Sequence, residues 1–305
     1  MTRTFFVNGK FVPEAKAVIP VTAHALHYGT GVFEGIRAYY SEKDKCFFAF
    51  RLEDHFKRMK QSAKIVFIDI PYTVDEMCGF VVELLQRNFT ETDMYVRPLA
   101  FKSDPAVGNF KLPTLQDSII MYNVPMGKYL DSEKGVRLGI SSWRRVSDNA
   151  IPPRGKITGA YINTCLTKTE AQLNGYDDAL VLDDRGHVVE SSSSNIFMIK
   201  DGVVITPPVS DDTLVGITRD TVIKLCTKEL GLQAIERSID RSEIYSADEA
   251  FLTGTAAEVT PIAEIDHRPL GESREVGTKL KDLFYKLVHG ELEKYSDWVT
   301  KVNPK

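Results

Sequence analysis

The stretch at residues 151–197 constrains the fold most, because it sets a glycine-flanked lysine, a helical run and short strands in a fixed order. Lys156 stands between Gly155 and Gly159, and the helical run after it ends at Asn174-Gly175, which is a typical helix stop signal. A nucleophilic amine needs little bulk around it, and small flanking residues let a flat ligand approach the backbone. Lys156 is therefore a candidate nucleophile, although on residue types alone an ordinary surface lysine is the simpler interpretation.

Composition limits the partners that such a lysine could serve. The 305 residues are 43% hydrophobic and 26% charged, so the chain can bury a substantial core as one large or two medium domains. Its net charge of -4 has interspersed signs, and no apolar run reaches membrane-spanning length. We therefore expect a cytoplasmic protein that acts on a small molecule, without nucleic acid or membrane partners.

Cysteine and histidine usage argues against a metal centre. The four cysteines are far apart with no metal-like spacing, and His24 and His27 have no nearby acidic or thiol partner to complete a ligand shell. We expect no metal site. Cys165 and Cys226 fall on apolar helix faces, so we expect free, buried thiols there.

The N-terminal part of the chain reads as a small β-rich unit. Asn8-Gly9 predicts a tight hairpin over residues 5–12. Apolar periodicity predicts amphipathic helices at residues 52–65 and 73–88. Arg58 lies off the apolar stripe of the first helix, where contact with water is the default expectation and a cleft is the alternative.

A second candidate position in this part is the sequence Tyr-Val-Arg-Pro at residues 95–98. It predicts an edge strand that Pro98 limits, with Tyr95 and Arg97 on the same face. A hydroxyl and a guanidinium two residues apart suit a carboxylate, although a surface salt bridge would produce the same pattern.

The C-terminal part mixes helices with short strands. Ile162, Leu166, Thr169 and Leu173 recur at helical spacing after Lys156. Gly216-Ile217-Thr218 precedes another apolar-periodic run, so a helix starts there whose N–H groups could bind an anion, or could simply be a capped end. Residues 252–257 form a strand-to-turn segment of small residues.

Together these segments resemble the branched-chain amino acid aminotransferases, pyridoxal 5'-phosphate enzymes of the fold-type IV aminotransferase family. The resemblance covers essentially the whole chain, and its pieces occur in the family's order: HALHYGTGVFEGIRAY, FRLEDHFKRMKQSAKI, YVRP, SSWRR, GKITGAY, GYDDALVLD, VVESSSSNIF, VGITRD and FLTGTAAEVTPI. It implies an α+β fold with a small N-terminal α/β domain at residues 1–122 and an interdomain loop at 123–135. A larger C-terminal domain at 136–305 would have a barrel-like β core and carry the Schiff-base lysine.

The resemblance also implies a role for each cofactor-binding residue. Lys156 would be the catalytic residue, which binds the cofactor aldehyde covalently and later moves the proton between the substrate Cα and the cofactor carbon. Glu190 would keep the pyridine nitrogen protonated, Tyr161 would contact the ring oxygen, and Arg58 would hold the phosphate. The full implied cofactor-binding set is Arg58, Lys156, Tyr161, Glu190, Ile217, Thr218 and Thr255.

For the substrate, the resemblance implies that Thr255 and Ala256, with Tyr95, receive the α-carboxylate. Arg97 with Tyr28 would take the second carboxylate of glutamate or 2-oxoglutarate. Val107 would be a wall residue supplied by the neighbouring subunit. The apolar side-chain pocket would be walled by Tyr28, Phe33 and Tyr161, with Trp143 and Tyr129 as further candidates.

The implied function is transamination between L-branched-chain amino acids (leucine, isoleucine, valine) and 2-oxoglutarate in two half-reactions, by a homodimer or higher homo-oligomer with active sites near the subunit interface. Two departures from the family pattern concern the substrate range. Serines at 191–194 replace a glycine-rich turn, as in D-amino acid aminotransferases, and Met126 replaces a frequent tryptophan. Activity toward D-amino acids or (R)-amines is therefore an alternative, as are an aminodeoxychorismate lyase-like enzyme and a cofactor-binding protein without turnover.

Overall fold

The computed structural model describes residues 3–127, 134–271 and 274–305, which form two compact units. The first unit comprises Met1–Gly127, Gly155–Gly159 and Lys286–Lys305, and the second comprises Lys128–Arg154 and Ala160–Tyr285. The segments at 155–159 and 286–305 thus group with the N-terminal residues, whereas the sequence placed them in the C-terminal domain. Residues 128–133 of the expected interdomain loop, Tyr129 among them, lie outside the described residues, and the loop's first residues belong to strand β7 (Asp117–Pro125).

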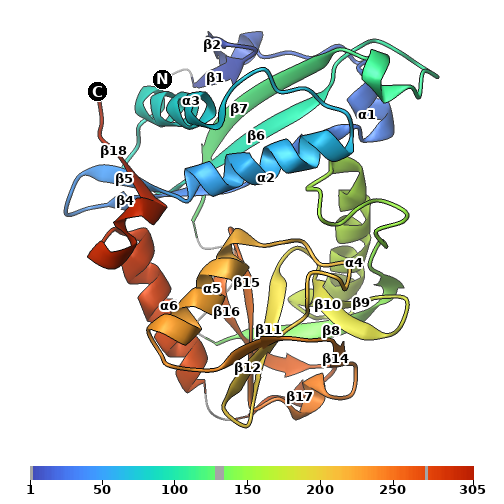
Figure 1. Cartoon of the computed structure of the whole chain (residues 1–305), viewed down its shortest axis with the longest axis vertical. Coiled ribbons are helices and arrows are strands. Elements are labelled where there is room, and N and C mark those ends of the chain that lie inside the picture. The colour runs from blue at the N-terminus through green and yellow to red at the C-terminus, as the bar shows by residue number, and fades with distance from the viewer. Residues whose placement is uncertain (1–2, 128–133, 272–273) are drawn as a thin grey trace. The chain divides into compact units, whose positions relative to one another are not determined.

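The first unit is built on an antiparallel sheet (Figure 1). Its strands pair in the order β18-β5-β4-β6-β7-β1-β2, and β3 also pairs with β6. Helices α2 and α3 pack against this sheet. The remaining strands are β1 (Thr4–Val7), β2 (Lys10–Pro13), β3 (Gly31–Phe33), β4 (Ile36–Ser41), β5 (Cys46–Phe50), β6 (Met94–Lys102) and β18 (Val299–Val302), and the helices are α1 (His24–Tyr28), α2 (Leu52–Ile65) and α3 (Val74–Arg87).

Local sequence signals account for several of these elements. The predicted hairpin is confirmed: Asn8 and Gly9 have positive φ angles of 45° and 87°, and they join strands that pair from Val7↔Lys10 outward. Both predicted helices are also confirmed. Helix α3 begins at a capping box, in which Thr73 accepts a hydrogen bond from the backbone of Glu76 and the Glu76 side chain accepts one from the backbone of Thr73.

Strand β6 is central in the sheet, so its predicted position at an edge was wrong. It pairs with β7 on one side and with β3 and β4 on the other. The Pro98 carbonyl accepts a hydrogen bond from the Glu34 N–H at 2.9 Å, so the proline nitrogen also faces the β3 and β4 side. Because the sheet breaks there between Phe33 and Ile36, the missing N–H of Pro98 costs no ladder hydrogen bond.

The second unit contains the barrel-like β core that the resemblance implied. Strands β8 (Val136–Arg144), β9 (Asp178–Leu182), β10 (His187–Ser191), β11 (Asn195–Lys200), β15 (Glu249–Gly254) and β16 (Glu258–Ile265) pair in a closed ring, because β10 also pairs with β11. Buried apolar side chains such as Leu138, Leu180, Ile196, Leu252 and Ile262 fill its core. The ring is extended by β12 (Val203–Thr206), β13 (Ala234–Glu236), β14 (Ile239–Asp240) and β17 (Arg268–Pro269).

The other elements are α4 (Tyr161–Leu173), α5 (Ile217–Lys228) and α6 (Glu275–Val288), which Figure 1 labels, and the 3-10 turns at Glu14–Lys16, Leu112–Thr114, Thr158–Ala160, Ile244–Ser246 and Glu293–Trp298. No helix within the described residues combines the length and apolarity needed to cross a membrane.

Helix α4 turns its apolar stripe outward. Leu173 is 83% exposed and Ile162 is 64% exposed. Cys165 on the same face is exposed, so the prediction of a buried thiol there was wrong, whereas Cys226 is buried as predicted. The face that packs on β8 and β9 is small and polar, with Asn163, Thr167 and Ala171 buried. Polar anchors such as the hydrogen bonds from Ser141 and Ser142 to Glu170 hold this face in place.

Candidate active site

The predicted site residues fall into both units. The first unit contains Tyr28, Phe33, Arg58, Tyr95, Arg97 and Lys156, and the second contains Tyr161, Glu190, Ile217, Thr218, Thr255 and Ala256. Within each unit the structure shows which of these side chains meet.

The backbone around Lys156 is fastened to the first unit on both sides. The Lys156 N–H donates to Ser62 Oγ at 3.0 Å, and the Lys156 carbonyl accepts from the Phe33 N–H at 3.0 Å. The next residue, Ile157, forms a β-bridge with Val32. The lysine therefore belongs to an ordered extended segment and is not a side chain on a free loop.

Glycines flank Lys156 for a steric reason that residue types alone did not give. Gly29 has a φ of +63°, and a Cβ there would lie 2.6 Å from the Gly159 Cα. The Gly159 N–H donates to the Gly29 carbonyl at 3.1 Å. The two backbones can approach this closely only because Gly29 has no side chain, and a Cβ at Gly159 would make a tight contact of 3.2 Å with the Gly29 carbonyl oxygen.

Phe33 is the common neighbour of two cationic side chains. Lys156 Nζ lies 5.0 Å from the centroid of the Phe33 ring, and the Arg97 guanidinium carbon lies 4.2 Å from the same centroid. Both distances are within the range of cation–π attraction. The structure thus brings the predicted nucleophile, one predicted pocket wall and the predicted carboxylate-binding arginine together.

Tyr95 and Arg97 form the pair that their spacing predicted. The Arg97 guanidinium donates to the Tyr95 hydroxyl, from Nη2 at 2.6 Å and from Nε at 3.2 Å. The hydroxyl reaches over Gly35, where a Cβ would lie 2.3 Å from Tyr95 Oη. Any side chain at position 35 would therefore displace the tyrosine.

Tyr28 is directed toward a different segment. Its hydroxyl accepts a hydrogen bond from the Gly108 N–H at 3.1 Å, and its ring packs edge-on against Phe110 at 5.2 Å. Val107 in this loop is 73% exposed. The expected cooperation of Tyr28 with Arg97 stays a prediction.

Arg58 is buried, and the expectation that it faces water was wrong. It is 9% exposed and pairs with Glu34, which is 0% exposed. Arg58 Nε donates to Glu34 Oε1 at 2.8 Å and Nη2 donates to Oε2 at 2.7 Å, and His55 Nδ1 lies 2.7 Å from Oε2. Sequence reasoning missed Glu34 and His55; the available signal was that His55 and Arg58 are three apart on one helix.

Electrostatics keep this cluster in one charge state. Burial by itself would raise the pKa of Glu34, but the charge of Arg58 and the hydrogen bonds from Arg58 and His55 outweigh it and hold that pKa well below its usual range. Burial lowers the pKa of His55, although its hydrogen bond to Glu34 opposes this. Because a carboxylate only accepts hydrogen bonds, the neutral imidazole carries its proton on Nδ1.

In the second unit, Glu190 is a buried carboxylate that is paired with an arginine, as Glu34 is in the first. It is 3% exposed at the end of β10, and its Oε1 lies 2.9 Å from Arg145 Nη2. Its Oε2 accepts from Asn195 Nδ2 and from the Leu214 N–H, each at 3.3 Å. Arg145 and Asn195 were also missed, although both belong to segments that carry the resemblance.

The serine turn after Glu190 is a compact, mostly buried hairpin. The Ser191 N–H donates to the Ser194 carbonyl at 2.7 Å, and the Ser194 N–H donates to Ser191 Oγ at 3.1 Å. Ser191, Ser192 and Ser194 are buried, whereas Ser193 is exposed. Serine hydroxyls and backbone groups thus take part in shaping this turn.

Helix α5 begins in a buried position without a side-chain cap. Its N-cap residue is Gly216, and its first residues Ile217 and Thr218 are 8% and 4% exposed. A Cβ at Gly216 would lie 2.0 Å from Asn195 Oδ1, so only glycine fits beside that amide. Asn195 therefore contacts both Glu190 and the start of α5.

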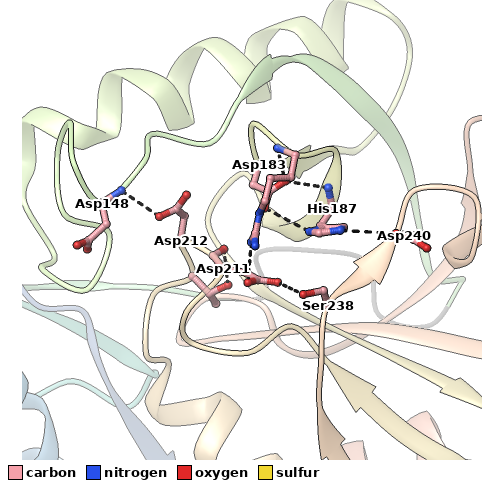
Figure 2. Close-up of polar contacts among 9 residues, drawn as sticks. Asp148, Asp183, His187, Asp211, Asp212, Ser238 and Asp240 are labelled. Carbon is pink, nitrogen blue, oxygen red and sulfur yellow. Dashed lines mark hydrogen bonds and ion pairs between the residues drawn. The ribbon is translucent and has the colours of Figure 1, made fainter.

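The loop that leads into α5 is tied down by an acidic network (Figure 2). Arg185 Nη2 lies 2.8 Å from both Asp183 Oδ2 and Asp211 Oδ1, and Ser238 donates to Asp211 at 2.5 Å. Next to Asp211, Asp212 accepts from the Asp148 N–H at 2.9 Å through its side chain and from Arg145 Nε at 3.2 Å through its carbonyl. Arg145 consequently joins this loop to Glu190.

The remaining predicted residues lie at element ends. Thr255 and Ala256 form the turn between β15 and β16, where Glu258 has a left-handed φ of 52°. Next to this turn, Thr253 Oγ1 is buried and has no hydrogen-bond partner within the described residues. Tyr161 is the first residue of α4 and is half-buried.

Comparisons with known proteins identify the family to which the chain is similar. Residues 31–265 match the model of the amino-transferase class IV family. The chain is 43% identical over 303 residues to a probable branched-chain-amino-acid aminotransferase of Aquifex aeolicus, covering 98% of this chain and 97% of that protein. It is 38% identical over 301 residues to the branched-chain-amino-acid aminotransferase of Salmonella typhimurium, covering 97% and 96%.

Solved structures are similarly close. The branched-chain aminotransferase of Thermoproteus uzoniensis with norvaline superposes with a TM-score of 0.95 at 43% identity, covering 99% of this chain and 100% of that one. The branched-chain amino acid aminotransferase of Thermobaculum terrenum in its PLP-bound holo form gives a TM-score of 0.93 at 36% identity, covering 99% of each chain.

Proposed function

This chain belongs to the class IV aminotransferase family, and we propose that it transfers amino groups between L-branched-chain amino acids and 2-oxoglutarate in two half-reactions. The observation that carries this proposal is the position of Lys156 and Arg97 beside the same aromatic ring, at 5.0 and 4.2 Å from the Phe33 centroid. A reactive amine, an apolar wall and a cation are what a site needs if it is to accept leucine-like and glutamate-like side chains alternately.

The residues present fit pyridoxal 5'-phosphate. A buried helix start without a side-chain cap, at Gly216 and Thr218, suits a phosphate, and so does the buried Arg58 cation. The Glu190 carboxylate suits a protonated ring nitrogen. The contacts with Arg145, Asn195 and Leu214 hold this carboxylate in one orientation.

Each side chain then has a defined task. When bound, the cofactor supplies an electron sink for negative charge at the substrate Cα. Lys156 would hold the cofactor aldehyde until the substrate amine displaces it, and its freed amine would then take the proton from the substrate Cα and deliver it to the cofactor carbon. Glu190 keeps a proton on the ring nitrogen. Arg58, Ile217, Thr218 and Thr255 bind the phosphate end, and Tyr161 hydrogen-bonds the ring oxygen.

The same proposal covers substrate recognition. Tyr95 and the Thr255 and Ala256 turn receive the α-carboxylate. The buried Thr253 hydroxyl beside that turn, which has no hydrogen-bond partner among the described residues, supports a ligand there. Phe33, Tyr28 and Tyr161 wall the side-chain pocket, and Arg97 binds the distal carboxylate of glutamate. Because Tyr95 already holds Arg97 at 2.6 Å, little side-chain freedom is lost when that carboxylate binds.

We further propose that the active form is a homodimer, with Val107 and Phe110 at the interface near the site. Their exposures of 73% and 70% in one chain, and the outward apolar stripe of α4, support an interface between copies. A cytoplasmic location stays a prediction.

A turnover panel tests the proposed substrate range. L- and D-amino acids and (R)- and (S)-amines are each assayed with 2-oxoglutarate as acceptor. The proposal predicts the highest kcat/KM for L-leucine, L-isoleucine or L-valine. The buried serine turn favours D-amino acids or (R)-amines as the alternative, and turnover confined to those donors would replace the substrate assignment while leaving the cofactor chemistry in place.

A further inference from the structure

We propose that Glu34 is a positioning residue, which orients the Arg58 guanidinium for the phosphate of the pyridoxal cofactor. This inference rests on the proposed function. It concerns a carboxylate that contacts neither Lys156 nor the substrate-binding pair in any described contact, and that acts through Arg58 alone.

The first support is the geometry of the ion pair. Arg58 Nε and Nη2 donate to the two different oxygens of Glu34, at 2.8 and 2.7 Å. Such a fork fixes the plane of the guanidinium as well as its position. The direction in which the Nη1 edge of Arg58 points is therefore set by Glu34, and not by the flexible arginine stem.

The second support is that Glu34 is itself held from several sides. His55 Nδ1 donates to Oε2 at 2.7 Å, and the Glu34 backbone N–H donates to the Pro98 carbonyl at 2.9 Å, where the sheet breaks. Glu34 is 0% exposed, so water is not available to replace either partner. A carboxylate fixed at both its backbone and its side chain can hold a cation in one orientation.

The third support is that the charge of Glu34 opposes the phosphate binding proposed for Arg58. The negative charge of Glu34 offsets the positive charge of Arg58, and a phosphate would bind more tightly to an uncompensated arginine. Through its charge the buried Glu34 carboxylate therefore weakens phosphate binding, whereas through orientation of Arg58 it would strengthen phosphate binding. The two effects have opposite signs, so a single substitution separates them.

The test compares the affinities of the apoprotein for pyridoxal 5'-phosphate and for pyridoxal, which lacks the phosphate. For Glu34→Gln, orientation loss predicts that the preference for the phosphorylated compound falls by about tenfold or more, as for other residues that orient a ligand-binding group. An unchanged or increased preference would show that Glu34 only compensates charge and would overturn the inference.

Glu34→Asp provides the second variant, because it keeps the buried negative charge but shortens the side chain that forms the fork. Glu34→Asp should also lose the preference for pyridoxal 5'-phosphate over pyridoxal. A wild-type preference in Glu34→Asp would contradict the positioning role of Glu34, and this result can be obtained even if Glu34→Gln does not fold. The matched control is Glu249→Gln, which removes another buried carboxylate, one that accepts from the Val276 and Gly277 N–H groups at 3.2 and 3.0 Å. Its preference should equal that of the wild type.

The proposed function can fail separately. If the wild-type protein shows no preference for pyridoxal 5'-phosphate over pyridoxal, the cofactor assignment is wrong, and the inference falls with it. If the wild type shows the preference and both Glu34 variants retain it, only the inference is wrong.

Discussion

Arg145 Nη2 lies 2.9 Å from Glu190 Oε1, and both side chains are largely buried, with exposures of 11% and 4%. This pair gives a negative carboxylate a fixed orientation inside the second unit. Removing one partner of a buried ion pair leaves an uncompensated charge, which is more costly than the pair itself is stabilising.

Arg145→Met should therefore lower the free energy of unfolding by about 3 kcal/mol. It should also weaken cofactor retention, since Glu190 then loses the contact that orients it. Urea unfolding and the cofactor content after dialysis measure the two effects. Arg51→Met is the control, because Arg51 is also buried, with its side chain 8% exposed, and pairs with Asp54 at 2.6 Å in the first unit. Equal cofactor loss in both variants would argue against a specific role for Arg145.

Gly29→Ala tests the close approach of the lysine segment. The added Cβ would meet the Gly159 Cα at 2.6 Å in a residue with a φ of +63°. Gly202→Ala is the control, because Gly202 has a φ of +76° but open space around it. This variant measures only the free-energy cost of a left-handed backbone conformation for alanine, which is about 1–2 kcal/mol. We expect Gly29→Ala to be more destabilising than Gly202→Ala in urea unfolding and to lower kcat. If the two variants were equally destabilised and Gly29→Ala kept the wild-type kcat, the contact between Gly29 and Gly159 would not be needed to position Lys156.

The pH dependence of stability should reflect the buried cluster on α2. The pKa of His55 is lowered by burial, so the unfolded chain binds more protons once the pH falls below 6.5, and stability decreases in that direction. The pKa of Glu34 is also lowered, so its contribution is present above pH 4.5 and is lost as the pH falls below that value.

Urea unfolding at a series of pH values tests this prediction. Each proton contributes a slope of at most about 1.4 kcal/mol per pH unit. His55→Gln should remove the part of the slope that begins near pH 6.5, whatever its effect on absolute stability. A slope identical to that of the wild type between pH 6.5 and about 5 would show that His55 does not cause it.

The outward stripe of α4 gives a prediction about assembly. Leu173→Lys places a charge on an apolar face that is 83% exposed at this position in one chain, and it should shift a dimer toward monomer in sedimentation velocity. Tyr285→Lys, at a 58% exposed position on α6, is the control and should not change the mass. A Leu173→Lys protein with the wild-type mass would place the interface elsewhere.

Local signals in the sequence predicted the local structure well. The Asn8-Gly9 hairpin and the helix Leu52–Ile65 depend on neighbouring residues, and both were found. The failures concern partners that are distant in sequence. Arg58 was expected to face water because Glu34, 24 residues away, does not belong to its periodic pattern.

Two other failures have the same origin. The apolar period of α4 identified a stripe correctly, but periodicity does not say whether a stripe faces the core or another surface, and here Asn163 and Ala171 face the core. Pro98 suggested an edge strand because proline lacks the N–H that a central strand needs. In the structure Pro98 faces the break between β3 and β4, and the sequence around Pro98 does not reveal this break in its partner strands. Glu34 and Arg145 were missed although both lie in segments that carry the resemblance, because their contacts are with residues distant in sequence, Arg58 and Glu190.

The most direct test of the account is a half-reaction experiment on the wild-type holoprotein and Lys156→Ala. L-Leucine should abolish the visible absorption band of the wild type, and 2-oxoglutarate should restore it. In Lys156→Ala, which should still bind the cofactor, both steps should slow at least about 100-fold, because the amine that moves the proton is absent. Near-normal cycling in Lys156→Ala, or a wild-type band that responds to D-alanine or an (R)-amine but not to L-leucine, would contradict it.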